Sequence, residues 1–126
     1  MNIEHLALWT HDLEEMRQFY ETHFGATAGK RYHNPHKQFT SYFLTFSGGA
    51  RLELMQRTDV TADNAIERLG YAHFALATGS QQRVDALTET LRAAGVRVVD
   101  EPRTTGDGYY ESVVLDPEGN RIELTV

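Results

Sequence analysis

Apolar residues follow two different spacings along the chain, and each change of spacing marks the passage from a predicted strand to a predicted helix. Ile3–Trp9 is a mostly apolar run of strand length, whereas Leu13–Phe24 places large apolar residues three or four positions apart. Asp12 is the expected N-cap of this helix, with Glu15 completing a capping-box pattern, and Gly25 is its expected C-terminal stop. The start of the chain therefore predicts a strand followed by a helix.

The same order begins again after residues 57–70, a polar stretch that we interpret as a linker with one helical turn at Asn64–Leu69. Tyr71–Ala77 is predicted to be a strand, and Ser80 is predicted to cap a helix that continues to about Ala94. Four residues are expected on the buried face of this helix: Val84, Leu87, Leu91 and Ala94. The second half therefore repeats the strand and helix of the first.

Short apolar or alternating runs predict the remaining strands. These are Ala26–Tyr32, Thr40–Phe46, Ala50–Gln56, Val96–Val99, Tyr109–Leu115 and Arg121–Val126. Ser47-Gly48-Gly49 and Asp116-Pro117-Glu118-Gly119 are turn sequences, so each joins two of these strands into a predicted hairpin. Asn34-Pro35-His36 marks a loop. Each half is thus predicted to have the order βαβββ.

Residues also recur between the halves. Glu4-His5-Leu6-Ala7-Leu8 matches Ala72-His73-Phe74-Ala75-Leu76, and Gly49-Ala50-Arg51-Leu52-Glu53-Leu54 matches Gly119-Asn120-Arg121-Ile122-Glu123-Leu124. Internal duplication of this kind predicts two similar structural modules. We therefore predict an α+β fold in which two βαβββ modules form a curved mixed sheet. Residues 1–126 are expected to be a single domain, with module one at 1–56, the linker at 57–70 and module two at 71–126.

Composition narrows the function classes. The chain has 126 residues, 40% of them apolar and 24% charged, with a net charge of −6 and no basic run. These values are typical of a globular domain and argue against nucleic acid as a partner. We expect neither a signal peptide nor a membrane span, so the predicted location is the cytoplasm. The chain has no cysteine, so a metal would need His, Asp, Glu or backbone oxygen, ligands that suit zinc, nickel, manganese, iron or magnesium.

Each half places one His in its first strand and one Glu in its last strand, among apolar neighbours. These residues are His5 and Glu53 in the first half, and His73 and Glu123 in the second. A carboxylate buried on a strand is costly without a partner, and a divalent cation would compensate that cost. Taken singly, such a His is more often a core or pocket residue, and Glu53 is compatible with an exposed strand face. The matched pairs favour a metal site built by all four residues.

The arginines beside the two Glu positions and the aromatic residues of the strands are expected to have structural roles. Arg51 and Arg121 are expected to be surface residues that face away from the neighbouring Glu positions. Most of the strand aromatics are expected to pack in the core, with one or two lining a pocket beside the metal: Trp9, Phe39, Tyr42, Phe43, Phe46, Tyr109 and Tyr110.

The duplicated His strand and Glu strand, with the turn Leu115–Asn120 before Arg121-Ile122-Glu123-Leu124, resemble the vicinal oxygen chelate superfamily over essentially the whole chain. This superfamily includes glyoxalase I, fosfomycin-resistance transferases, methylmalonyl-CoA epimerase, extradiol dioxygenases and bleomycin-binding proteins. The resemblance implies a glyoxalase-like fold. The order His, Glu, His, Glu is most similar to that of glyoxalase I.

By that resemblance His5, Glu53, His73 and Glu123 bind one divalent metal, which would be zinc, nickel, manganese, iron or cobalt. Glu123 would be the catalytic base, with Glu53 opposite it. The implied activity is that of a metal-dependent lyase or isomerase of the lactoylglutathione lyase type, which acts on a small oxygenated substrate through a metal-stabilised enediolate. Trp9 stands where glyoxalase I generally has Arg, which argues against the usual glutathione contacts.

Three alternatives remain open at this point. An extradiol dioxygenase or a fosfomycin-type thiol transferase would use the same site with two His and one Glu. A small-molecule or drug-binding protein would need no metal. Open sheet edges and small size favour a homodimer. In a homodimer the four metal ligands would come either from one chain or from both chains.

Overall fold

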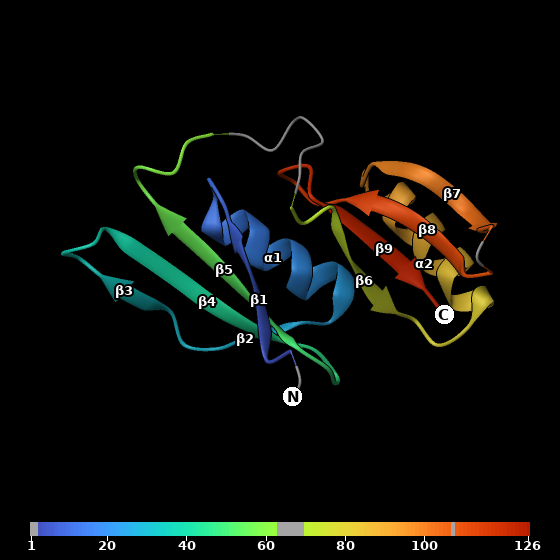
Figure 1. Cartoon of the computed structure of the whole chain (residues 1–126), viewed down its shortest axis with the longest axis horizontal. Coiled ribbons are helices and arrows are strands. Elements are labelled where there is room, and N and C mark those ends of the chain that lie inside the picture. The colour runs from blue at the N-terminus through green and yellow to red at the C-terminus, as the bar shows by residue number, and fades with distance from the viewer. Residues whose placement is uncertain (1–2, 63–69, 107) are drawn as a thin grey trace. The chain divides into compact units, whose positions relative to one another are not determined.

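The computed structural model describes residues 3–62, 70–106 and 108–126. The chain divides into two compact units, Met1–Asp63 and Asn64–Val126, and each unit has its own sheet and its own helix (Figure 1). The helical turn predicted at Asn64–Leu69 lies outside the described residues. Among those residues no helix combines the length and hydropathy needed to span a bilayer.

The first unit is a five-stranded mixed sheet with one helix. Its elements are β1 (His5–Trp9), α1 (Leu13–Phe24), β2 (Thr27–Ala28), β3 (Tyr32–Asn34), β4 (Phe39–Thr45) and β5 (Arg51–Arg57). The strand order is β1-β5-β4-β2, and β3 also pairs with β4. β1 runs parallel to β5, whereas β4 and β5 form the predicted antiparallel hairpin. The one strand predicted at Ala26–Tyr32 is therefore replaced by two short strands that both pair with β4.

The second unit repeats this topology with four strands. Its elements are β6 (His73–Ala77), α2 (Gln81–Ala93), β7 (Val98–Thr104), β8 (Tyr110–Leu115) and β9 (Arg121–Thr125). The strand order is β6-β9-β8-β7, with β6 parallel to β9. The predicted duplication and the α+β fold class are thus confirmed. β7 continues beyond the predicted end at Val99, because an edge strand with register shifts tolerates Pro102.

Both helices begin at their predicted N-caps, and α1 also ends at its predicted glycine. The Asp12 carboxylate accepts hydrogen bonds from the backbone N–H groups of Glu14 and Glu15 at 3.1 and 2.9 Å. Gly25 ends α1 in the left-handed conformation, with φ of 63°. Ser80 Oγ accepts from Arg83 N–H at 3.3 Å and caps α2. These caps confirm the start and end of α1 and the start of α2.

The predicted buried face of α2 needs one correction. Val84 and Leu91 are fully buried, but Leu87 is only half-buried, Ala94 is exposed, and Thr88 is fully buried between them. The Thr88 hydroxyl donates to the Val84 carbonyl at 2.7 Å and lies 2.7 Å from Ser112 Oγ on β8. Thr88 can be buried in this core because its hydroxyl group has hydrogen-bond partners there.

In each unit the helix covers one face of the sheet. In the first unit Leu13, Met16 and Tyr20 of α1 are buried with Leu52 and Leu54 of β5. In the second, α2 packs on β8 and β9, where Val114, Ile122 and Leu124 are fully buried. Residues that alternate with these point to the opposite face, the face turned away from the helix.

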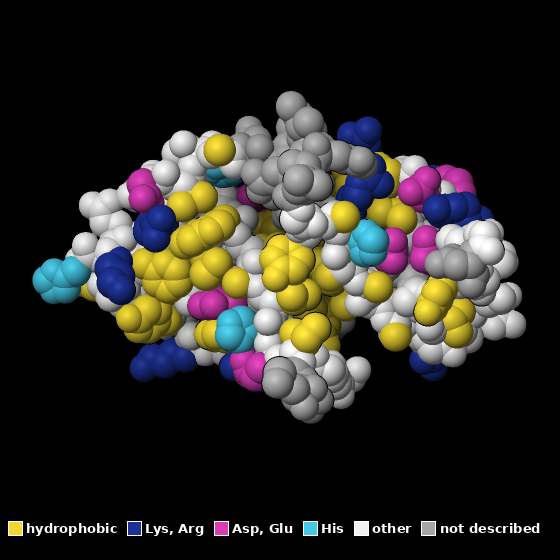
Figure 2. Space-filling view, viewed as in Figure 1, with side chains coloured by type: hydrophobic (Ala, Val, Ile, Leu, Met, Phe, Trp, Pro, Cys, Tyr) yellow, Lys and Arg dark blue, Asp and Glu magenta, His cyan; other side chains and the backbone are white. Residues whose placement is uncertain are grey.

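The expectation that most strand aromatics pack in the core is wrong. Trp9 and Tyr109 are 40% and 61% exposed. The other five are half-buried: Phe39, Tyr42, Phe43, Phe46 and Tyr110. Alternation places Trp9, Phe39 and Phe43 on the face turned away from α1, whereas the aromatic core residues, Phe19 and Tyr20, come from α1 itself. Hydrophobic side chains accordingly appear on the surface in the space-filling view, with histidines and acidic groups among them (Figure 2).

Candidate metal site

In the first unit the fold brings together the predicted pair His5 and Glu53. β1 and β5 are adjacent parallel strands, and Ala7 stands opposite Glu53 in the register. His5, two residues before Ala7, shares its face, which is the face turned away from α1. His5 Nε2 lies 3.9 Å from Glu53 Oε2, and the two side chains are 40% and 15% exposed.

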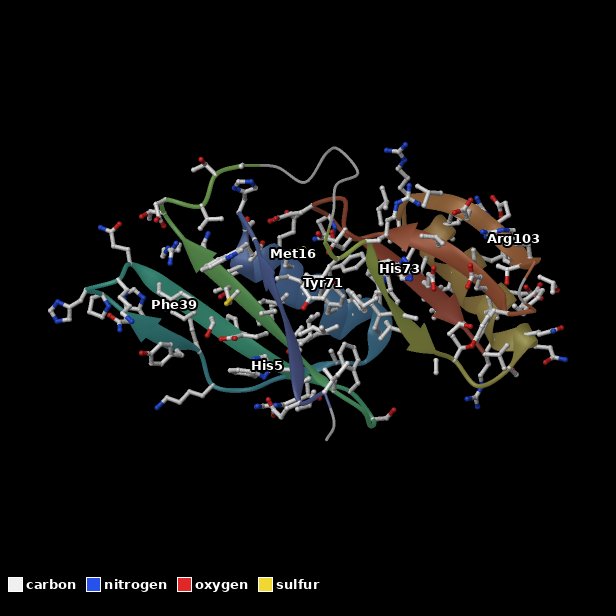
Figure 3. The ribbon with its side chains drawn as sticks, in the orientation of Figure 1. His5, Met16, Phe39, Tyr71, His73 and Arg103 are labelled. Carbon is white, nitrogen blue, oxygen red and sulfur yellow. The ribbon has the colours of Figure 1, made fainter. Side chains whose placement is uncertain are left out.

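The second unit forms the same pair by the same means. β6 is parallel to β9, and Ala75 stands opposite Glu123. His73 Nε2 lies 3.1 Å from Glu123 Oε1, with side-chain exposures of 43% and 19%. His5 and His73 each stand on the first strand of their own sheet (Figure 3). In both units, therefore, the same ring nitrogen faces a mostly buried carboxylate.

The chemistry of each pair fits half of a divalent-metal site. Imidazole nitrogen and carboxylate oxygen bind such ions at about 2.0–2.2 Å, so two neighbouring ligands lie about 3 Å apart. The His73–Glu123 separation matches this spacing, and the His5–Glu53 separation exceeds it by less than an ångström. In the described part of either unit, no third His, Asp or Glu completes a group that could hold an ion alone. Each unit thus presents two side chains of a chemical type that could bind a divalent metal.

The outer nitrogen of His5 has an acidic partner that sequence reasoning missed. His5 Nδ1 lies 2.5 Å from Glu4 Oε2, and Arg51 Nε donates to Glu4 Oε1 at 2.7 Å. The hydrogen bond with His5, followed by the Arg51 guanidinium, holds the pKa of the Glu4 carboxyl below its ordinary value. The only sequence signal for this contact was an acidic residue directly before the candidate ligand.

The prediction that Arg51 and Arg121 face away from the Glu positions is wrong. Residues two apart in a strand share a face, so Arg51 lies on the face of Glu53 and Arg121 on that of Glu123. The Arg51 guanidinium stands over the Phe43 ring, 4.2 Å from its centroid. Arg121 is nevertheless exposed, as a surface residue should be.

An aromatic group lies on the same face as His5 and Glu53. The ring centroids of Trp9 and Phe39 are 6.2 Å apart at an interplanar angle of 90°, and those of Tyr32 and Phe39 are 6.1 Å apart. The Arg57 guanidinium lies 5.0 Å from the Trp9 ring. Trp9 and Tyr32 keep 40% and 54% of their surface exposed. This face therefore offers planar apolar side chains for contact, next to the positively charged guanidinium of Arg57.

A cavity of about 510 Å³ in the first unit is separate from the His–Glu pair. Its lining is mostly polar and includes Thr10, His11, His33, Gln56 and Arg57. Neither His5 nor Glu53 belongs to it, so its shape gives no information on the candidate metal site.

The chain belongs to the Glyoxalase/Bleomycin resistance protein/Dioxygenase superfamily, whose family model matches residues 2–124. This class accounts for the doubled topology and confirms the resemblance inferred from the two His–Glu repeats.

The individual proteins that the chain resembles have low sequence identity to it. The chain is 28% identical over 127 residues to the uncharacterized protein YqjT of Bacillus subtilis (strain 168), covering 97% of this chain and 96% of that protein. The structure of the present chain is similar to the crystal structure of SMU.1112c, with a TM-score of 0.82 and 25% identity. The similarity covers 100% of this chain and 98% of SMU.1112c. The trypanothione-dependent glyoxalase I of Leishmania major has the same fold, with a TM-score of 0.80, 24% identity and coverage of 99% and 86%.

Proposed function

We propose that this protein is a divalent-metal-dependent lyase or isomerase of the glyoxalase type that acts on a small oxygenated substrate. The observation that carries the proposal is the repeated His–Glu pair, in which Nε2 of His5 and of His73 faces a carboxylate. His5, Glu53, His73 and Glu123 together would hold one ion. Residues 1–126 would then act as one domain of two modules, each of which contributes half of the ligands.

The protein's own residues would divide the work. A bound divalent ion would supply Lewis-acid chemistry to two neighbouring substrate oxygens. Glu123 would take a proton from the carbon beside those oxygens and return it to the adjacent carbon, with Glu53 opposite it. Burial supports this role, because Ile122 and Leu124 are fully buried on the other face of β9 and anchor the strand that carries Glu123.

The surroundings of the site favour a substrate with an apolar part. Trp9, Phe39 and Tyr32 share the face of His5 and Glu53. Planar side chains that are partly exposed gain free energy when they contact an apolar group. A glutathione carboxylate, by contrast, would meet Trp9 where glyoxalase I generally offers Arg. The proposed substrate is therefore a small oxygenated molecule other than a glutathione adduct.

The proposed assembly is a homodimer. In the described part of the chain, β1 and β2 end the strand order of the first sheet and β6 and β7 end that of the second, and unpaired edges are common sites of association. In such a dimer the two halves of one site would come from one chain or from both.

Metal analysis combined with enzymology tests the proposal. The purified chain is expected to bind about one divalent ion for each set of His5, Glu53, His73 and Glu123. It is also expected to isomerise an α-oxo compound or a hemithioacetal formed with a thiol other than glutathione. Glu123→Gln is expected to keep the metal and to lose turnover by about 10²- to 10⁴-fold, the usual contribution of a general base. Glu101→Gln, which alters an exposed carboxylate on β7, is the matched control and should leave turnover unchanged.

Three results would contradict the proposal. A chain that gains no metal from micromolar zinc, nickel, manganese, iron or cobalt would have no metal centre. Wild-type turnover in Glu123→Gln would remove Glu123 as the base. Oxygen uptake by the iron-loaded protein would assign the site to a dioxygenase instead.

A further inference from the structure

The outer nitrogen of His5 contacts a carboxylate, whereas the matching position of the second half has no acidic residue. Glu4 Oε2 lies 2.5 Å from His5 Nδ1, while His5 Nε2 points toward Glu53. At the matching position before His73 the chain has Ala72. We propose that Glu4 is a positioning residue that orients His5 to bind metal through Nε2, and that the second half lacks this contact at the position of Ala72. The metal-binding part of this inference rests on the proposed function.

Glu4 is itself held by Arg51. Its Oε1 accepts from Arg51 Nε at 2.7 Å and also contacts Arg51 Nη2, so one carboxylate joins the guanidinium and the imidazole. The backbone N–H of Arg51 donates to the Glu4 carbonyl at 2.9 Å, which extends the pairing of β1 with β5 to Glu4. Two separate contacts therefore fix the position of Glu4 on the strand next to the ligand.

Phe43 makes a second contact with the imidazole ring of His5 and links it to Arg51. Phe43 meets His5 edge to face, with ring centroids 5.2 Å apart and an interplanar angle of 86°. Arg51 stacks on Phe43, 4.2 Å from its ring centroid. Glu4, His5, Phe43 and Arg51 thus form a closed circuit of contacts, and a turn of the imidazole would break both the contact with Phe43 and the bond to Glu4.

The bond to Glu4 determines which nitrogen is available to a metal. A carboxylate at Nδ1 keeps the proton on that nitrogen in the neutral ring and leaves the lone pair on Nε2. A partner on the outer nitrogen also makes the imidazole a stronger donor. Because Nε2 already faces Glu53, the first half has its histidine oriented before any ion arrives.

The second half has part of this arrangement but not the carboxylate. Arg121 stands opposite His73 in the register, as Arg51 stands opposite His5. Ala72 cannot accept a hydrogen bond through its side chain, so His73 has no equivalent of the Glu4 contact from that position. His73 is therefore the internal control for His5. The variant Ala72→Glu would place a carboxylate before His73, as Glu4 stands before His5.

Long-range ¹⁵N NMR of the imidazoles in the metal-free protein tests the orientation. In mildly alkaline buffer, His5 is expected to show the Nδ1–H tautomer. Glu4→Ala should convert it to the mixed signature of a solvated histidine, and Glu4→Gln, which keeps an acceptor oxygen, should restore part of the difference. Ala72→Glu should move His73 toward the Nδ1–H signature. An unchanged His5 signature in Glu4→Ala would overturn the proposal.

Zinc titration tests the consequence for metal binding. Glu4→Ala is expected to weaken zinc binding by about 10- to 100-fold, the usual effect of removing the partner of a ligating histidine. Glu101→Ala is the matched control, because Glu101 is also paired with an arginine and is 66% exposed, against 62% for Glu4. An equal loss in Glu101→Ala would show a general charge effect and overturn a specific role for Glu4.

The two measurements separate this inference from the proposed function. If the wild-type chain binds no zinc, the proposed metal centre fails, and the tautomer of metal-free His5 alone decides whether Glu4 orients the ring. If zinc binds but Glu4→Ala changes neither the tautomer nor the affinity, the metal centre stands and the role of Glu4 is refuted.

Discussion

The buried hydroxyl pair of Thr88 and Ser112 allows a quantitative test of how α2 is attached to its sheet. Both residues are fully buried, and their oxygens lie 2.7 Å apart. Thr88 has one hydroxyl hydrogen, which it donates to the Val84 carbonyl, so Ser112 must be the donor to Thr88. The two residues therefore have unequal roles, and their substitutions are expected to have unequal effects.

Thr88→Val keeps the shape of the side chain but leaves the Ser112 hydroxyl without its acceptor. An unsatisfied buried hydroxyl of this kind costs about 1–3 kcal/mol. Ser112→Ala removes only a donor, and Thr88 keeps its bond to Val84, so the expected loss is about 1 kcal/mol. The double variant has no orphaned hydroxyl, and its loss should fall short of the sum of the single losses by about 1 kcal/mol, within the range found for residues in contact.

Urea denaturation followed by circular dichroism measures these free energies of unfolding, provided the slope with denaturant is the same in all four proteins. The reasoning would be refuted if the losses simply added, because the two hydroxyls would then be uncoupled. It would also be refuted if Ser112→Ala cost clearly more than Thr88→Val, since the assigned direction of the hydrogen bond would be wrong.

Two further predictions concern α1. Asp12→Ala removes the acceptor for the N–H groups of Glu14 and Glu15 and should lower the free energy of unfolding by about 1 kcal/mol; a loss below the error of urea titration would contradict the cap. The hydrogen bond from Tyr42 lowers the pKa of Glu14, so the stabilisation from this group is present above the unfolded-state pKa and is lost as the pH falls through the lower folded-state pKa. Tyr42→Phe should raise the Glu14 pKa toward its ordinary value, as measured by carboxyl ¹³C NMR titration, and should reduce the loss of stability at acid pH. An unchanged Glu14 pKa would show that the positive charges of Arg17 and Arg31 set it without Tyr42.

Elements that depend on neighbours in sequence could be predicted from the sequence. The period of apolar residues, the Asp12 cap and Gly25 predicted α1 at its observed limits, Leu13–Phe24. The turn at Asp116–Gly119 predicted the last hairpin, and Asp116 does accept from the backbone N–H groups of Glu118 and Asn120. The assignment of His5 with Glu53, and of His73 with Glu123, followed from the repeat.

Errors arose where a residue's surroundings come from distant strands. The aromatic strand residues were expected in the core, but only the cross-strand register shows that Trp9 and Phe39 lie on the face turned away from α1. Thr88 was not assigned to the core because its partner, Ser112, comes from β8. Arg51 lies on the face of Glu53 because residues two apart in a strand share a face. Its contacts with Glu4 and Phe43 depend on the pairing of β1, β5 and β4.

By itself, therefore, the sequence determined the elements, their duplication and the residue types of the candidate metal site, because caps, turns and periodicity act over a few residues. The tertiary structure decided which strands are neighbours and in what register. That register places each His beside its Glu, puts Arg51 next to Glu4, and gives His5 an acidic partner that His73 lacks at the matching position. Contacts between strands far apart in the chain depend on packing the whole sheet, which no local pattern encodes.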